Sequence, residues 1–333
     1  MKNFLSIVLA AAVLVGCNKE NTLGSVEKPE IGFGEAFVNN STKAADLNNA
    51  NLVDFGVFGA ITVGTEKGKI FDNDRVYKNS SNDFVYDNTQ YWIPSAQYYF
   101  TAIAPYQSGA DAAWSYATDE AQNGTITYDA SKDVDLLFAY VKPAKTAATI
   151  TSQPDKVDFT FDHMLSRARF TFVNEVPAVS NITFKITEVK VLDAYKVGTL
   201  AVAEGVAGAW AAAADNNTFE VAFANAATVI PGEAENVTNY ESTEHHYILP
   251  VKKELNVSFK IEVYQAGVSL GVYERSTKVN IEPVKGMSYD IKANLTVNNA
   301  LPNALYPIEF KVNPITEWVN FSEVTAGDIV ANN

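Results

Sequence analysis

The chain has 333 residues, of which 47% are hydrophobic, so it carries ample apolar material for one or two folded domains. Its formal net charge of −14 argues against binding nucleic acid through a basic surface. Its single cysteine, Cys17, excludes an intramolecular disulfide, so the fold must depend on its hydrophobic core.

The first residues have the layout of a secretory signal. Lys2 supplies a positive charge, and the apolar run from Phe4 to Val15 is too short to span a bilayer as a stable helix. Leu14 to Cys17 match the bacterial lipobox, in which the signal is removed just before a cysteine that then carries lipid. We therefore predict a signal peptide at residues 1–16 and a lipidated Cys17. The alternative is an ordinary signal peptide with an accidental cysteine.

The next part of the chain changes from polar to strand-like. Asn18 to Pro29 have the composition of a flexible tether. Ile31 to Val38 predict a short strand, and Asn39 to Asp46 have loop composition. Further strand-like runs follow at 53–57 and 98–103.

The clearest strand signals lie later, where apolar and polar residues alternate. These segments are 157–161, 168–172, 182–186, 257–263 and 308–312. Successive side chains of a strand point to opposite faces, so the pattern predicts sheets with one buried face, packed as sandwiches. The Ala-rich stretch from Trp210 to Asp215 is expected to form a short helix or an irregular excursion. We predict an all-β protein with two tandem β-sandwich domains and a boundary within 174–178.

Catalytic and metal-binding patterns are scarce. His245 and His246 are adjacent and would face opposite sides of a strand, which does not favour a shared metal. His163 lies between two strand patterns, where we expect a packed or hydrogen-bonded turn residue. The chain has no Gly-x-Ser-x-Gly motif, and nothing singles out a Ser-His-Asp set. We therefore predict no enzyme activity, no metal and no cofactor.

Aromatic residues leave two interpretations open. Tyr91 to Pro94, followed by Tyr98 to Phe100, could form a stacking platform for sugars, with Trp92 as the contact. Alternatively, these rings fill the core and edge the sheet. The first interpretation corresponds to a monomeric glycan-binding protein of the cell surface.

Three features together resemble the fimbrillin family, the lipoprotein-derived pilins of Bacteroidia-type bacteria. The first is the lipobox at Leu14 to Cys17. The second is the segment Phe159 to Phe170, which is similar to that family's aromatic-x-His-x-Leu-Ser/Ala-Arg pattern. The third is the closing pattern of Gly286 to Ile291 with Ile308 to Phe310 and Trp318. The resemblance covers essentially the whole chain.

The resemblance implies a fold and a mode of assembly. It implies two transthyretin-like β-sandwich domains behind a short N-terminal strand, in a lipoprotein carried to the outer membrane and cell surface. A trypsin-like protease then cuts after a basic residue behind that strand, and a strand from another fimbrial subunit fills the groove left open. Main-chain hydrogen bonds and alternate side chains would hold the added strand. Because the contact is head-to-tail, it generates an open filament that supports adhesion.

Mapped onto this sequence, the resemblance divides the chain into defined parts. Residues 17–43 form the lipidated pro-segment, with Ile31 to Val38 as the removable strand. Residues 44–176 and 177–318 form the two sandwiches. The candidate cleaved bond joins Lys43 to Ala44; the best-known members of the family have arginine there, and the first arginine here is Arg75. Residues 319–333 form the candidate donor strand, with Val319, Phe321, Val324 and Ile329 as its anchors.

Overall fold

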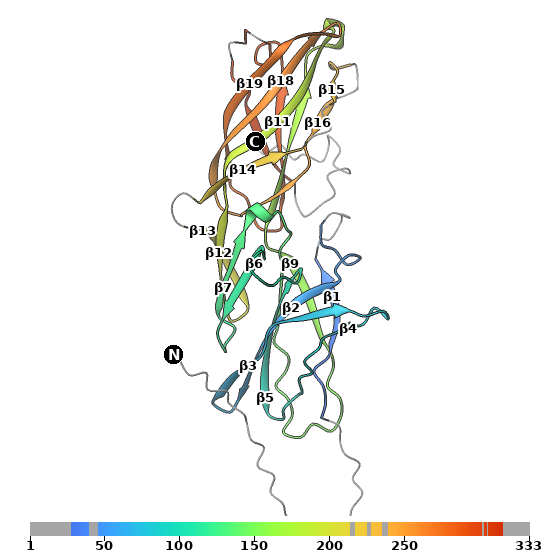
Figure 1. The fold of residues 1–333 in the computed structure, drawn as a ribbon, viewed down its shortest axis with the longest axis vertical. Helices are drawn as coiled ribbons and strands as arrows, with labels where there is room; N and C mark the ends of the chain where they lie inside the picture. Colours follow the sequence, from blue (N-terminus) through green and yellow to red (C-terminus); the bar gives the residue numbers. More distant parts are fainter. Residues whose placement is uncertain are drawn as a thin grey trace, which may run out of the picture.

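The computed structural model describes residues 28–39, 46–213, 217–224, 228–234, 239–301, 303–304 and 306–315. These residues form 21 β-strands and two three-residue 3-10 helices, η1 (Ala130–Lys132) and η2 (Ala178–Ser180). The predicted all-β class is confirmed. The molecule is elongated, with strands from the two halves of the chain gathered mainly at opposite ends (Figure 1). In the described part of the chain, no helix has the length and apolarity needed to cross a membrane.

The N-terminal end is built on a seven-stranded sheet in the order β1-β9-β8-β5-β2-β3-β4. Its strands are β1 (Phe33–Val38), β2 (Asp54–Val63), β3 (Glu66–Lys78), β4 (Phe84–Val85), β5 (Ala96–Ala104), β8 (Leu137–Val141) and β9 (Val157–His163). Neighbours are antiparallel except β1 and β9, which run parallel. One aromatic-rich core cluster draws on these strands and their adjoining segments, so the sheet curls around it.

A four-stranded sheet covers the other face of this curled sheet. It has the order β13-β12-β7-β6, with β6 (Trp114–Thr118), β7 (Gly124–Asp129), β12 (Val197–Ala203) and β13 (Val206–Ala212). Phe58 on β2 and Ile103 on β5 pack against its inner face in a second core cluster. Because β2 and β5 pack on both faces, most of their residues are buried, which removes the alternation of polar and apolar residues.

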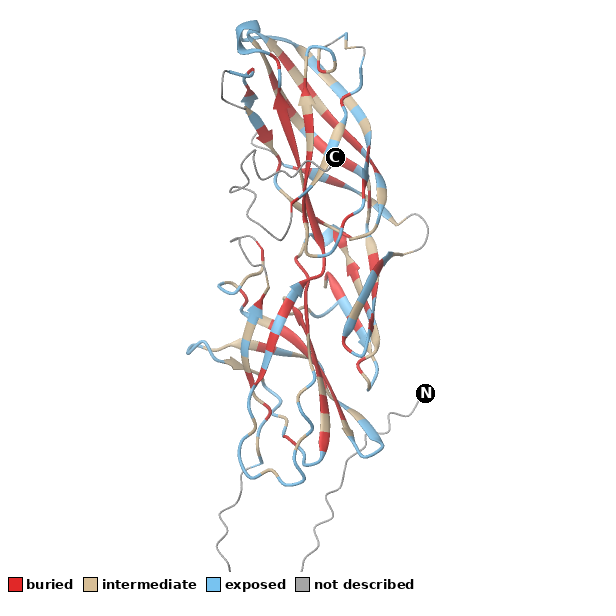
Figure 2. Cartoon of the chain, turned by 180° about the vertical axis from the view of Figure 1, so that it is seen from behind, coloured by how far each residue is buried: buried red, intermediate tan, exposed pale blue. Residues whose placement is uncertain are grey.

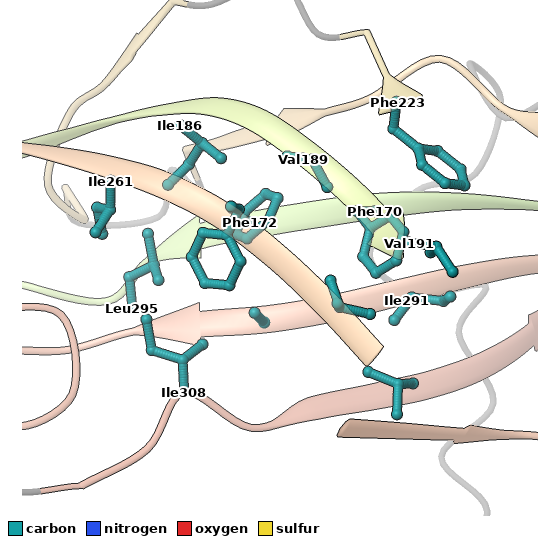
Figure 3. Close-up of a cluster of buried hydrophobic side chains, with 14 of the residues drawn as sticks. Phe170, Phe172, Ile186, Val189, Val191, Phe223, Ile261, Ile291, Leu295 and Ile308 are labelled. Carbon is teal, nitrogen blue, oxygen red and sulfur yellow. The ribbon is translucent and has the colours of Figure 1, made fainter. Parts of the chain in front are cut away.

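The C-terminal end is a sandwich of two five-stranded sheets. One contains β10 (Ser166–Asn174), β16 (Tyr240–Ser242), β17 (His246–Ile248), β20 (Ser288–Leu295) and β21 (Phe310–Ile315). The other contains β11 (Ile182–Tyr195), β14 (Thr218–Phe223), β15 (Val229–Ile230), β18 (Lys253–Gln265) and β19 (Val268–Ile281). Phe170 and Phe172 of the first sheet meet Ile186 and Ile261 of the second in the core (Figure 3).

The alternating segments form strands as predicted. The segments 157–161, 168–172, 182–186 and 257–263 lie in β9, β10, β11 and β18, and 308–312 overlaps the start of β21. In β9 every second residue from Val157 to His163 is buried and the others are exposed. The same banding of buried and exposed residues follows the long strands of the C-terminal sandwich (Figure 2).

Two segments cross between the ends of the molecule. β10, on the N-terminal side of the expected boundary, runs parallel to β20 in the C-terminal sandwich. β12 and β13, from the C-terminal side, extend the sheet of β7. A short helix or irregular excursion was expected from Trp210 to Asp215. This expectation is wrong for Trp210 to Ala212, which form the last three residues of strand β13. Trp210 is buried there, and its Nε1 donates to the carbonyl of Met164 at 2.7 Å.

Candidate functional site

Strand β1 lies at the edge of the seven-stranded sheet, beside β9. Phe33 pairs with Val157 and Val38 with Phe161, with one register shift between Phe33 and Ala36. This is the strand predicted from Ile31 to Val38. It is also the first strand along the described chain.

The side chains of β1 nevertheless belong to the core. Ile31, Phe33 and Val38 are 1%, 2% and 0% exposed. The Phe33 ring lies 5.4 Å from that of Tyr86 and 5.9 Å from that of Phe159, measured between centroids. Fully burying one such side chain contributes about 1.5–3 kcal/mol. An edge strand thus fills a deep part of the hydrophobic cluster.

The residues just before β1 bond to two separate parts of the sheet. The Ile31 amide donates to the Gln90 carbonyl at 2.8 Å, and the Trp92 amide donates to the Pro29 carbonyl at 2.8 Å. On the other side, the Val157 amide donates to the Gly32 carbonyl at 2.8 Å. Residues 29–32 therefore bridge β9 and the segment that follows β4, and they cover the space between these two elements.

A buried polar cluster lies just beyond β1 in sequence. The Asp46 carboxylate forms an ion pair with Arg167 on β10, and neither side chain has exposed surface. Tyr247 Oη donates to Asp46 Oδ1 at 2.7 Å, and His245 Nε2 lies 3.2 Å from the same oxygen. Arg167 Nε also donates to the Ser288 hydroxyl at 2.7 Å. The cluster thus ties Asp46 to three segments of the C-terminal end.

The electrostatics of this cluster favour a charged Asp46. Burial alone would raise the pKa of the Asp46 carboxyl, but the His245 hydrogen bond, the Arg167 charge and the Tyr247 hydrogen bond together lower it to about 2. Burial and the nearby carboxylates of Asp135 and Asp46 raise the pKa of Tyr247. The phenol therefore keeps its proton and remains a donor to Asp46.

All three histidines contact an aspartate where the two ends of the molecule meet. His163 Nδ1 lies 3.0 Å from Asp135, and both side chains are buried. His246 Nδ1 lies 2.7 Å from Asp133, and His245 pairs with Asp46 as described. His163 is packed and hydrogen-bonded as predicted, but the expected turn is wrong, because His163 is the last residue of strand β9. Among the described residues no group of three or more metal-ligating side chains could hold an ion.

Comparison with models of protein families shows which family this chain belongs to. The model of the fimbrillin-like family, Mfa_like_1, matches residues 42–314. The chain belongs to the fimbrillin-like family. A comparison with curated proteins found no similar chain.

Several solved structures are similar to this fimbrillin-like chain. A candidate cell adhesion protein from Bacteroides uniformis is 15% identical with a TM-score of 0.47, covering 88% of this chain and 99% of that one. A candidate cell adhesion protein from Bacteroides ovatus is also 15% identical, with a TM-score of 0.46 and coverages of 88% and 98%. The fimbrial anchor protein Mfa2 from Porphyromonas gingivalis is 10% identical, with a TM-score of 0.36 and coverages of 85% and 96%.

Most of the predicted site residues of this fimbrillin-like chain lie outside the described residues. They are Cys17, Lys43, Ala44, Val319, Phe321, Val324 and Ile329. Trp92 is described, and it is 5% exposed with its ring 4.6 Å from that of Tyr98. A sugar platform needs an exposed ring face, so Trp92 fits the core interpretation and not the glycan contact.

The buried cluster around Asp46 was missed by the sequence reasoning. Arg167 belongs to the segment that resembles the fimbrillin family, but the pattern gave it no partner. A usable signal was present, since Arg167 opens a strand-like run and a buried arginine needs a charged partner. Its partner lies 121 residues away, a separation that no local pattern reveals.

Proposed function

We propose that this chain is a structural fimbrial subunit, exported as a lipoprotein and assembled by proteolysis-triggered β-strand exchange to support surface adhesion. Membership of the fimbrillin-like family supports the fimbrial role. The observation that carries the mechanism is strand β1, which lies at a sheet edge yet fills the core with Ile31, Phe33 and Val38. Removing such a strand leaves both apolar pockets and unpaired main-chain groups of β9, and a new strand can satisfy both.

The candidate cleaved bond between Lys43 and Ala44 is compatible with the structure on either side of it. Lys43 and Ala44 stand in sequence between Val38, the last residue of β1, and Asp46, which is held by Arg167. A trypsin-like protease cutting there would separate β1 from the chain and leave Asp46 with the retained part. Cleavage at Lys43 would thus free the strand and leave the polar cluster with the retained part of the chain.

The donor strand in this proposal is the C-terminal segment 319–333 of another subunit, anchored by Val319, Phe321, Val324 and Ile329. A donor at one end and a groove at the other make a head-to-tail contact, which builds an open filament. The partners are other fimbrial subunits and the processing protease. The precursor would attach to the outer membrane through lipid on Cys17, and we expect no enzyme activity and no cofactor. We also propose that residues 44–176 and 177–318 correspond to two transthyretin-like domains that exchange strands, with β10 in the C-terminal sandwich and β12 and β13 at the N-terminal end.

The test is the intact mass and N-terminal sequence of the protein sheared from cells of its natural source. A new N-terminus at Ala44, in material that runs as a ladder of oligomers, would support the processed subunit. A monomer that keeps a lipidated Cys17 and stays with the membrane would overturn the polymerising role. Deletion of residues 319–333 tests the donor separately, and undiminished polymers would exclude that segment.

A further inference from the structure

Two lysines lie directly opposite each other in the C-terminal sandwich. Lys292 on β20 pairs with Lys311 on β21 in the antiparallel register of these strands. The residues that flank them along each strand pack against the core, which are Ile291 (Figure 3), Ala293, Phe310 and Val312. Because successive side chains of a strand alternate between faces, both lysines point away from the core, on the same outer face of the sheet.

The facing lysines work against the stability of this sheet. Like charges at directly opposite positions of an antiparallel pair are destabilising. Neither lysine forms an ion pair with a carboxylate in the described part of the chain. Asp290, two residues from Lys292 on β20, is instead paired with Arg169 at 3.1 Å. The protein thus keeps two adjacent cations on one face, although its formal net charge is −14.

Both lysines line a pocket with a volume of about 420 Å³. This volume lies within the range of sites that hold a small ligand. The rest of the described lining comes from β20, from the connection between β20 and β21, and from the start of β21. Glu309 is the one carboxylate in this described lining, which therefore carries one net positive charge.

Hydrogen bonds shape the wall of the pocket that follows β20. The Thr296 amide donates to Asn299 Oδ1 at 2.8 Å, and Asn299 Nδ2 donates to the Asn294 carbonyl at 2.9 Å. The Ala300 amide donates to the Thr296 carbonyl at 3.0 Å. These bonds use both ends of the Asn299 amide to fix the turn. The neighbouring Asn298 is exposed and lines the pocket, where its amide can bind a ligand.

An aromatic ring lies at the rim of the same pocket. Tyr306 is 65% exposed and lines the pocket with Asn298. The Tyr306 amide donates to the Asn298 carbonyl at 3.4 Å, so the two residues are held beside each other. An exposed ring face can pack against the C–H groups of a sugar, and a side-chain amide can both donate to and accept from sugar hydroxyls.

We propose that this pocket binds an acidic saccharide, whose carboxylate or sulfate group lies between Lys292 and Lys311 and whose ring packs on Tyr306. Hydrogen bonds from two ammonium groups would hold the anion. The bound anion would also relieve the repulsion between the lysines, so binding stabilises the fold. The site belongs to a different sheet from β1, and it does not depend on the proposed strand exchange.

Isothermal titration calorimetry of the purified full-length chain tests the ligand class. The acidic sugars are N-acetylneuraminic acid, which carries a carboxylate, and N-acetylglucosamine 6-sulfate. Neutral N-acetylglucosamine, sodium sulfate and a tetraglutamate peptide are the comparison probes. At least one acidic sugar should bind about tenfold or more tightly than each comparison probe, because a hydrogen bond to a charged group contributes a factor of this size.

Substitutions test the location of the site. Lys292→Gln and Lys311→Gln should each weaken the binding of the acidic sugar by about tenfold or more. Tyr306→Ala should weaken it by about three- to tenfold, whereas Tyr306→Phe should leave it unchanged. Lys67→Gln, which changes an exposed lysine on β3 at the N-terminal end, is the matched control and should have no effect.

Urea denaturation separates a ligand-binding lysine from a structural one. Because removing one of the two like charges relieves their repulsion, Lys292→Gln should not lower the midpoint of unfolding. Saturating acidic sugar should raise the midpoint of the parent chain and leave that of Lys292→Gln unchanged. A lowered midpoint for Lys292→Gln without sugar would assign this lysine to the fold and overturn its role in binding.

Four binding results would also overturn the proposal. Equal affinities for N-acetylglucosamine and its 6-sulfate would show that the lysine pair does not recognise the anion. Sodium sulfate binding as tightly as the acidic sugars, with no effect of Tyr306→Ala, would reduce the pocket to a simple anion site. Tighter binding of tetraglutamate would assign the lysine pair to an acidic protein partner. Absence of binding by both acidic sugars would exclude the proposed ligand class.

Discussion

The guanidinium of Arg167 and the carboxylate of Asp46 form an ion pair in which neither side chain has exposed surface. Asp46 lies eight residues beyond the end of β1, and Arg167 lies in strand β10 of the C-terminal sandwich. The pair therefore fixes the chain on the retained side of the candidate cleavage site. In the proposed mechanism, β1 can depart while the residues after it stay attached to the rest of the molecule.

Replacing Arg167 with methionine should destabilise the protein strongly. The change leaves the Asp46 carboxylate buried without its countercharge, which costs about 3–5 kcal/mol. The free energy of unfolding, measured by urea denaturation, reports the loss. Lys252→Met is the matched control. The side chains of Lys252 and its ion-pair partner Glu282 are 74% and 72% exposed, so this pair should contribute less than about 1 kcal/mol.

A second substitution identifies the cause of that loss. Adding Asp46→Asn to the Arg167→Met chain removes the uncompensated charge and should recover part of the lost stability. Additive losses from the two substitutions would contradict the ion pair as the source.

The depressed pKa of Asp46 predicts a specific loss of stability in acid. Its folded-state pKa is about 2, below the ordinary 3.8, so the charged form is favoured by folding. This contribution is fully present above pH 4 and is lost as the pH falls from 4 toward 2. Its size is about 2 kcal/mol. Urea denaturation at several pH values should give a steeper decline for the native chain than for Asp46→Asn, and parallel curves would contradict the assignment.

Local sequence patterns predicted individual strands well. The alternation in Val157 to Phe161 predicted β9, since one face of this strand is buried and the other is exposed to solvent. It could not predict partners, because pairing depends on contacts between distant segments. β9 and β10 follow each other closely in sequence but belong to different sheets. For the same reason, the sequence did not predict that β12 and β13 pair with the sheet of β7 at the N-terminal end.

The candidate site was predicted in part. The edge strand β1 was predicted within Ile31 to Val38 because it is a short apolar segment between two polar stretches. Trp92 was ambiguous, since core and binding aromatics have the same composition and only packing against Tyr98 distinguishes them. The register shift in β1 was not predicted, because it depends on the pairing with β9.

Phe33→Ala should destabilise the precursor and leave the processed subunit unaffected. Removing this buried ring costs about 3–5 kcal/mol, since the surrounding rings can close the cavity only partly. Urea denaturation of the unprocessed chain measures that loss. Phe37→Ala on the same strand should change the free energy of unfolding by less than about 0.5 kcal/mol, because Phe37 is 53% exposed. A processed subunit that carries the Phe33 effect would show that β1 had not been removed.

The turn between β12 and β13 offers a test of how the two ends of the molecule are joined. Gly205 has φ of +78°, and a Cβ there would meet the ring of Tyr140 on β8. Gly267, in the turn between β18 and β19, has φ of +81° and open space around it. Alanine at Gly267 should cost only the conformational penalty, about 1–2 kcal/mol. Alanine at Gly205 should cost a further 1–3 kcal/mol or so, because the hairpin must separate from β8 or displace the ring.

Thermal denaturation of the two alanine variants measures this difference, and a third variant checks its origin. Adding Tyr140→Ala to Gly205→Ala removes the clash, so the double variant should lose less stability than the sum of its two single substitutions. Equal losses from Gly205→Ala and Gly267→Ala would instead mean that the hairpin does not press on β8. In that case the crossing strands would be joined to the N-terminal end mainly through the pairing of β12 with β7.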